Sequence, residues 1–197
     1  MRFELLRQFG WFVSESSEHT AEYTPYFLRR DDQIEAYHVP VDEYIRRSEA
    51  NMREYADTRR ALLAGEALVL HPTVEYGAGI IHAMVTNEPA LIYGNVRNTR
   101  LIDNLPEDCC VEVPVVVDCN GLRPCHVGKL PPELAAHCAP HVFVQELVVR
   151  AALDGDRARV YRAALLDRLA PSVLSISEVR AMVDELIAAH GAALPFA

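Results

Sequence analysis

Apolar residues recur at helical spacing over residues 3–9 and predict a short amphipathic helix that ends at Gly10. The next three residues, 11–13 (WFV), are all apolar and predict a buried extended segment. A first helix with almost nothing before it leaves several amide donors without a cap. We therefore expect further sequence upstream of this helix.

A long polar stretch follows at 42–64. It is rich in Arg, Glu and Ala with sparse apolar positions, which predicts a long surface helix that stops at Gly65. A second helix is expected at 74–85, where apolar residues dominate. After a proline, the apolar run 90–93 predicts a strand, and a loop is expected over 94–106.

The run 110–118 (CVEVPVVVD) is apolar and β-branched and predicts another strand. Because proline cannot donate to a strand ladder, Pro114 predicts that this strand lies at a sheet edge or carries a bulge. The pair Asn120-Gly121 then predicts a hairpin turn.

The last third of the chain has a helical pattern. We predict helices at 142–153, 157–169 and 177–190, with Ser177 as the N-cap of the last one. The segment 129–140 is expected to be irregular.

The chain is acidic, with a formal net charge of -9. Nucleic-acid binding needs clustered Lys and Arg, so we expect no nucleic-acid partner and a neutral or polar small substrate instead. No run of about 18 apolar residues is present and the start does not resemble a secretion signal, which predicts a cytoplasmic protein with no membrane partner. The five cysteines are odd in number and include the adjacent Cys109-Cys110, which favours free thiols in a reducing compartment.

Three stretches carry a resemblance to a known family. They are FVSESSEHTAEYTPYF at 12–27, EPALIYGNVRNTRLIDNLPEDCCVEVPVVVD at 88–118, and the helical tail at 144–190. Together they resemble the C-terminal half of glycoside hydrolase family 4 enzymes, in the branch of α-galactosidases and α-glucosidases.

The resemblance implies an α+β fold, with a mixed or antiparallel sheet around 90–118 packed by long helices. This is the architecture of the C-terminal domain of lactate dehydrogenase-like enzymes, which the family resembles. Residues 1–197 would then form one substrate-binding and oligomerisation domain, and the N-terminal Rossmann domain would be absent from this chain.

The resemblance also implies a chemistry that departs from the two-carboxylate scheme of most glycosidases. In the family, NAD takes hydride from C3 of the sugar, a base removes the C2 proton, and the glycosidic oxygen is eliminated. A divalent metal, usually Mn²⁺, polarises the sugar oxygens. The family's metal ligands and dinucleotide loop lie upstream of the matched region, and the only close glycine pair, Gly77 and Gly79, lies in a helical pattern. We therefore expect no NAD-binding or metal-binding residue in this chain.

Tyr23 matches the position of the tyrosine that the family uses as the C2 base. A phenol has a reference pKa of about 10, so a nearby positive charge or metal would have to lower it. The alternative is that Tyr23 is an ordinary half-buried aromatic residue.

The polar cluster around Tyr23 is a candidate for sugar binding. Glu18, His19 and Glu22 have side chains suited to sugar hydroxyls or to orienting a metal-bound water, as do the neighbouring residues 15–17. Ser17 could instead cap a helix.

The second motif supplies Asn95, Arg97 and Asn98 as further substrate-binding candidates, with Asn104 nearby. Asparagine also tolerates left-handed turns, so a structural role is an equal alternative. Arg100 stands where relatives usually have glycine. If that position needs a positive φ, arginine there costs roughly 1 kcal/mol or more.

Six further side chains could form a zinc site, although their spacing fits no standard zinc motif. They are Cys119, Cys125, His126, His137, Cys138 and His141.

Three hypotheses follow. The preferred one is the C-terminal half of an α-galactosidase or α-glucosidase, inactive alone, acting on a small sugar as a homo-oligomer or with a partner chain that carries the NAD-binding domain. The second is a non-catalytic remnant or subunit, and the third is a small zinc-binding protein.

Overall fold

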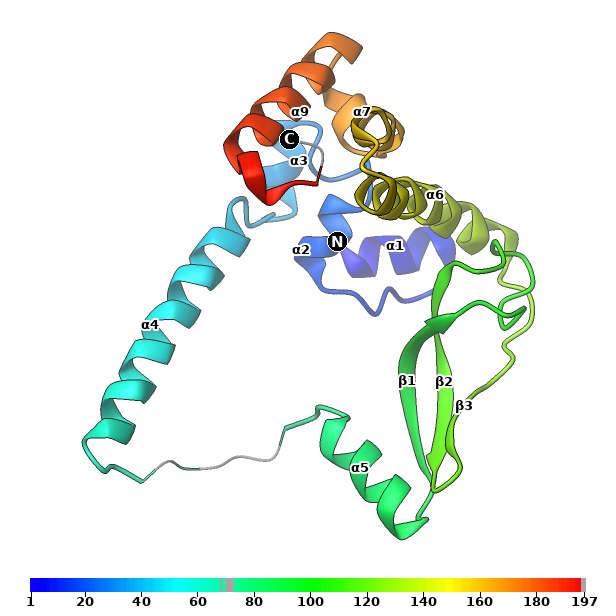
Figure 1. Cartoon of the computed structure of the whole chain (residues 1–197). Coiled ribbons are helices and arrows are strands. Elements are labelled where there is room, and N and C mark those ends of the chain that lie inside the picture. The colour runs from blue at the N-terminus through cyan, green and yellow to red at the C-terminus, as the bar shows by residue number, and fades with distance from the viewer. Residues whose placement is uncertain (68, 70–72, 196–197) are drawn as a thin grey trace.

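The computed structural model describes residues 1–67, 69 and 73–195. Over these residues the fold is helix-rich with one sheet, which is antiparallel, in agreement with the mixed or antiparallel sheet and long helices expected from the family resemblance (Figure 1). The helices before the sheet are α1 (Arg2–Phe9), α2 (Ser17–Glu22), α3 (Asp31–Ala36), α4 (Glu43–Leu63) and α5 (Gly77–Thr86). The strands are β1 (Ala90–Arg97), β2 (Cys110–Asp118) and β3 (Gly121–Pro124). After them come α6 (Pro132–Asp154), α7 (Arg157–Leu166), α8 (Ala170–Val173), α9 (Ile176–His190) and the short 3-10 helix η1 (Gly191–Ala193).

Strand β2 lies in the centre of the sheet, so the prediction of an edge or bulged strand was wrong. Its register with β1 runs without a break from Ala90 opposite Val117 to Arg97 opposite Cys110. The N–H of Cys125 donates to the carbonyl of Pro114 at 2.8 Å, immediately beyond the end of β3. In an antiparallel pair, a residue's N–H and C=O point to the same neighbour. The nitrogen of Pro114, which has no hydrogen to donate, therefore points toward the β3 side of the sheet, just beyond the end of β3. The hydrogen bonds between β2 and β1 do not need this donor.

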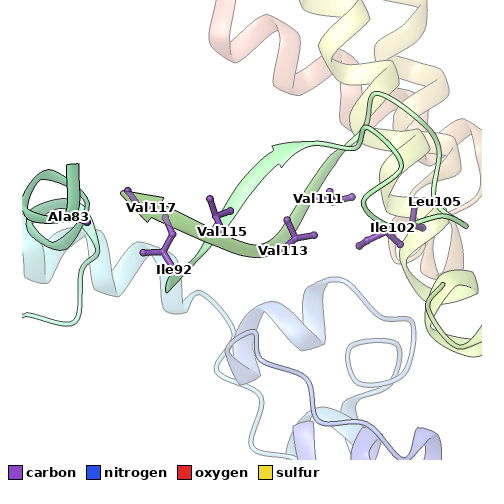
Figure 2. Close-up of a cluster of buried hydrophobic side chains, with 8 residues drawn as sticks. All are labelled: Ala83, Ile92, Ile102, Leu105, Val111, Val113, Val115 and Val117. Atoms are coloured by element: carbon purple, nitrogen blue, oxygen red, sulfur yellow. The ribbon is translucent and has the colours of Figure 1, made fainter. Parts of the chain in front are cut away.

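One face of the sheet carries the main apolar core (Figure 2). Valines at alternate positions of β2 point to this face, and Val113, Val115 and Val117 are almost fully buried. Helix α5 covers one end of it through Ala83, and the 98–109 loop covers the other end through Ile102 and Leu105.

Two predicted strand boundaries shift slightly. Strand β1 continues to Arg97, four residues beyond the predicted end, so the loop begins later than expected. The β2–β3 hairpin turns at residues 119–120, because Asp118 pairs with Gly121, which has a φ of 99°. The glycine is needed for its positive φ, one position after the turn itself.

Helix α6 contradicts the expected irregular segment at 129–140. It runs from Pro132 to Asp154 and contains Pro140 in its interior. Pro132 suits the first turn, where a helix does not need the missing N–H, but Pro140 leaves one helical hydrogen bond unmade. Pro140 therefore made the sequence pattern predict that no helix crosses this position. The helix continues through it because tertiary packing offsets the cost of the missing hydrogen bond.

The segment 11–13 is also not buried as predicted. Trp11 and Phe12 are 53% and 51% exposed, and the ring of Phe12 contacts that of Phe3 at 5.8 Å between centroids. The chain therefore presents aromatic surface at this point.

The elements are arranged openly (Figure 1). Helices α1 and α2 lie beside α6, and the helix α4 extends away from this helical group, far from the sheet. Helices α6, α7 and α9 pack in sequence upon one another. None of the described helices is long and apolar enough to cross a membrane.

Candidate active site

Tyr23 lies at the C-terminal end of helix α2. Its N–H donates to the carbonyl of His19 at 2.9 Å, and its side chain is 49% exposed. Ser16, rather than Ser17, caps the helix, because its Oγ accepts from the N–H of His19. The cap and this short helix fix the direction in which the phenol projects.

A cleft of about 350 Å³ opens beside the Tyr23 ring. Its floor is mostly apolar, and the polar groups in it come from α2, from residues 14–15 and from α6. The lining residues are Leu5, Phe9, Trp11, Phe12, Val13, Ser14, Glu15, Thr20, Tyr23, Thr24, Leu130, Leu134, His137, Cys138 and His141. An apolar floor with a few convergent polar groups is typical of a small-molecule site.

Two histidines of α6 face the cleft one helical turn apart. The ring of His141 meets the Tyr23 ring edge-on at 5.4 Å, with an interplanar angle of 73°. His137 lies against Phe9 at 5.3 Å and receives a hydrogen bond at Nδ1 from Arg168 at 2.7 Å. Because a guanidinium can only donate, His137 must carry its proton on Nε2.

The same surroundings keep both rings neutral. Burial lowers the pKa of His137, and the positive charge of Arg168 lowers it further. Burial and then Arg168 also lower the pKa of His141. Tyr23 therefore faces a neutral imidazole that can accept or donate a hydrogen bond at neutral pH.

The other α2 candidates do not line the cleft. His19 Nδ1 lies 2.8 Å from Glu22 Oε2, and this hydrogen bond raises the pKa of His19. The N–H of Glu18 itself and then the hydroxyl of Ser16 lower the pKa of Glu18. These groups form a charged edge on α2, outside the residues that line the cleft.

The second motif lies elsewhere in the fold. Asn95 is exposed on β1, and Arg97 forms an exposed ion pair with Asp108 through Nε at 2.7 Å. None of the second-motif candidates lines the Tyr23 cleft within the residues that the structure describes. The sequence motifs therefore do not converge on one site in this chain.

Asn98 is fully buried and uses its whole amide inside the loop. Its Nδ2 donates to the carbonyls of Ile102, Leu105 and Pro106, and its Oδ1 accepts from two backbone amides. Asn104 similarly pairs its amide with the backbone of Leu130 at 2.9 Å in both directions. This geometry favours the structural alternative for both asparagines.

The sequence analysis predicted His137 and His141 only as zinc ligands, not as residues that line a cleft. Their spacing of i, i+4 places them on one face of a helix. The sequence analysis could not use this spacing, because it predicted residues 129–140 to be irregular rather than helical. Trp11 and Phe12 were expected in the core and were missed as lining residues.

A model of the family 4 glycosyl hydrolase C-terminal domain matches residues 1–170. The chain belongs to glycoside hydrolase family 4. Curated relatives in the family include an α-galactosidase of Bacillus subtilis strain 168, which is 42% identical over 99% of this chain and 46% of its own length. An α-galactosidase of Rhizobium meliloti strain 1021 is 31% identical over 99% of this chain and 42% of its own length. The chain thus spans less than half the length of these family 4 relatives.

Solved family 4 structures share the fold. The crystal structure of lplD from Bacillus subtilis aligns with a TM-score of 0.83 at 23% identity, over 94% of this chain and 42% of that one. A 6-phospho-alpha-glucosidase from gut microorganisms, solved with NAD and Mn²⁺, aligns with a TM-score of 0.73 at 20% identity, over 98% of this chain and 43% of its own. These matches confirm the family 4 C-terminal fold.

The described residues do not bring together the ligands of a metal site. Within residues 1–67, 69 and 73–195, no group of three or more His, Cys, Asp or Glu side chains could hold a metal ion. The six residues proposed for zinc are also scattered: Cys119 lies in the β2–β3 turn, His126 contacts Asp103, and His137 is bonded to Arg168. The described residues therefore do not fit a metal by themselves, and the zinc hypothesis is wrong for them.

Proposed function

We propose that this chain forms the sugar-facing half of an α-galactosidase, with Tyr23 as the base that removes the C2 proton. The main observation behind this proposal is that Tyr23 lines a preformed cleft, between the neutral His141 ring and the charged edge of α2. Relatives named α-galactosidase at 42% and 31% identity support the substrate assignment. Cleavage would follow the family's oxidation and elimination route rather than the two-carboxylate route.

The chemistry of the cleft favours a neutral sugar. Among the described residues that line it, none is Lys or Arg. A uronate or a sugar phosphate is normally recognised by guanidinium or ammonium groups. Relatives named for such substrates match at lower identity or over less of this chain: an α-galacturonidase is 25% identical, and a 6-phospho-alpha-glucosidase is 33% identical over only 48% of this chain. We therefore favour α-galactosides, with α-glucosides as the alternative.

Activity by this chain alone is not expected in this proposal. A phenol acts as a base only when ionised, which requires a nearby positive charge. The cleft lining contains no permanent cation among the described residues, and the pKa of each of the two histidines is lowered. A second polypeptide segment that supplies that charge, together with NAD, would complete the site.

A second candidate is a non-catalytic subunit or remnant that depends on a separate NAD-binding chain. The observation that favours it is the aromatic surface beside the cleft, where Phe3, Trp11 and Phe12 are all at least half exposed. Arg2 lies over the Phe12 ring at 5.2 Å, which is within cation–π distance. Exposed apolar surface of this kind marks docking sites.

The experiment joins this chain to the N-terminal half of the Bacillus subtilis α-galactosidase. The fusion should hydrolyse p-nitrophenyl α-galactoside with NAD, Mn²⁺ and reductant, and Tyr23→Phe should lower kcat by about 100-fold or more. Tyr26→Phe is the matched control, because Tyr26 is a partly exposed tyrosine of the same segment that does not line the cleft.

Three results would count against the proposal. Equal turnover by the fusion and its Tyr23→Phe variant would remove Tyr23 as the base. A folded fusion without turnover, alongside an active intact Bacillus subtilis enzyme, would favour the non-catalytic candidate. Turnover of the nitrophenyl α-galacturonide at the same rate would contradict the neutral-sugar assignment.

A further inference from the structure

His137 of helix α6 is bonded to a residue from a distant part of the chain. Nη1 of Arg168 donates to Nδ1 of His137 at 2.7 Å, although the two residues are 31 positions apart. Arg168 lies in the turn between α7 and α8. Asp167 holds this turn, because its Oδ1 accepts from the N–H groups of Leu169 and Ala170 at 2.7 and 2.8 Å. Helices α6 and α7 pack on each other, so the turn brings the guanidinium to His137 (Figure 1).

This contact fixes the proton of the imidazole. A guanidinium only donates, so the lone pair of Nδ1 accepts and the ring proton lies on Nε2. A second proton on Nδ1 would place an N–H and a positive charge directly against the guanidinium. The pKa of His137 is accordingly lowered, first by burial and then by the charges of Arg168 and His141. The charged groups that shift the pKa of His141 are Arg168, which lowers it, and Asp167, which raises it.

The Nε2–H of His137 is left for a ligand, since no described residue accepts a hydrogen bond from it. Within residues 1–67, 69 and 73–195, no buried side-chain nitrogen or oxygen lacks a hydrogen-bond partner, so this nitrogen is not sealed in the interior. His137 lines the Tyr23 cleft, and the rings of Phe9 and Tyr26 flank it at 5.3 and 6.3 Å between centroids. The imidazole thus offers one accessible donor in a ring that its neighbours hold in place.

Other polar groups of the cleft can accept hydrogen bonds but have no proton to donate. The hydroxyls of Thr20 and Thr24 already donate to the carbonyls of Ser16 and Thr20 at 2.7 and 2.9 Å. A carboxylate such as that of Glu15 only accepts, and its Oε1 already accepts from the N–H of Ser16 at 2.7 Å. A sugar hydroxyl both donates and accepts, so a bound sugar also needs a donor from the protein.

We infer that His137 donates the hydrogen bond that orients the sugar in this cleft, and that Arg168 keeps it a donor. This role depends on the proposed sugar site and adds a residue that positions the substrate there. His141, which contacts the Tyr23 ring, lies roughly 6 Å further along the helix axis than His137. A pyranose ring can therefore have one oxygen at His137 and its C2 at Tyr23. A neutral donor matches the uncharged oxygens of such a sugar.

The first test determines the tautomer of His137 in the full 197-residue chain by imidazole ¹⁵N NMR. The wild-type ring should be the Nε2–H tautomer at neutral pH. Arg168→Met removes the donor and its charge, so the pKa of His137 should rise and the Nδ1–H form should appear. Arg162→Met removes a charge from an exposed position of α7 and should change neither. An Nδ1–H tautomer in the wild type, or a wild-type tautomer and pKa in Arg168→Met, would overturn the role of Arg168.

The second test compares two amides at position 137, with methyl α-galactoside as the probe and the NMR shifts of the chain as the readout. In His137→Gln the side-chain amide places an N–H near the former Nε2, whereas in His137→Asn the shorter amide reaches only the former Nδ1. We expect a Kd within about 3-fold of wild type for His137→Gln and a rise of about 10-fold for His137→Asn, which is the loss of one hydrogen bond. Because both variants lose the imidazole ring, equal losses would show that His137 only packs and would overturn its role as donor. A wild-type chain without shifts at about 0.1 M sugar, which saturates millimolar binding, would overturn it too.

The roles of His137 and Tyr23 can be separated. Sugar binding by this chain does not need Tyr23 to ionise, so a fusion whose turnover is unaffected by Tyr23→Phe leaves the His137 result standing. An active fusion that requires Tyr23, combined with equal Kd values for His137→Gln and His137→Asn, would keep the base and remove the donor.

Discussion

Arg100 holds a left-handed backbone conformation, with a φ of 67°. A side chain with Cβ pays about 1 kcal/mol there relative to glycine, and the exposed ion pair of Arg100 with Glu107 at 3.2 Å offsets little of this. Arg100→Gly should therefore raise the free energy of unfolding by about 1 kcal/mol relative to Arg100→Ala, which loses the same ion pair but keeps the strain. Urea denaturation of both variants measures the difference. Equal stabilities would show that the loop relaxes around the arginine.

The behaviour of a single residue could be predicted from the sequence where it depends on that residue's own backbone conformation. The sequence predicts strain at Arg100 only if this position needs a positive φ, because relatives usually have glycine there. The observed positive φ of Arg100 meets that condition. The orientation of the asparagines could not be predicted, because a motif does not say which side chain turns inward. Asn98 is buried and bonded inside the loop, while Asn95, three residues earlier on strand β1, is exposed.

At the scale of the elements, the start of α9 gives a sharp comparison between two serines. Ser175, rather than the predicted Ser177, is the N-cap, because its Oγ accepts from the N–H of Glu178 while the Glu178 carboxylate accepts from the N–H of Ser175. Ser175→Ala should lower the free energy of unfolding by about 1 kcal/mol, and Ser177→Ala, inside the first turn, by much less. Thermal denaturation of the two variants measures this. A larger loss for Ser177→Ala would contradict the capping box.

Elements were predicted well where the pattern is local and long. The polar helix at 42–64 and the strand at 110–118 lie within a residue of α4 and β2. The failures share a cause: Pro114 and Pro140 are local signals against structure that contacts made elsewhere in the chain override. Cys125 takes the position beside Pro114, and α7 packs along α6. Such contacts are invisible in a single sequence.

At the scale of the whole molecule, apolar burial is divided between separate groups of residues. One group surrounds the sheet, α5 and the 98–109 loop, and a second consists of Leu5, Ala21 and Phe27 with their neighbours. The buried residues of α9, which include Val179 and Val183, belong to neither group. The prediction of one domain over residues 1–197 stays a prediction, because composition and length set the amount of core but not its division.

This division predicts local rather than global destabilisation. Val113→Ala removes two methyl groups from the centre of the sheet core, where Val113 is fully buried, and should cost about 2 kcal/mol. Amide hydrogen exchange should accelerate in β1 and β2 but stay unchanged in α9, because opening of the sheet need not expose the helical group. Glu112→Ala, on the opposite face of the same strand, is the control and should change neither. If Val113→Ala instead accelerates exchange equally in β2 and α9, the chain unfolds as one cooperative unit, and the sheet and the helices are energetically coupled despite their separate cores.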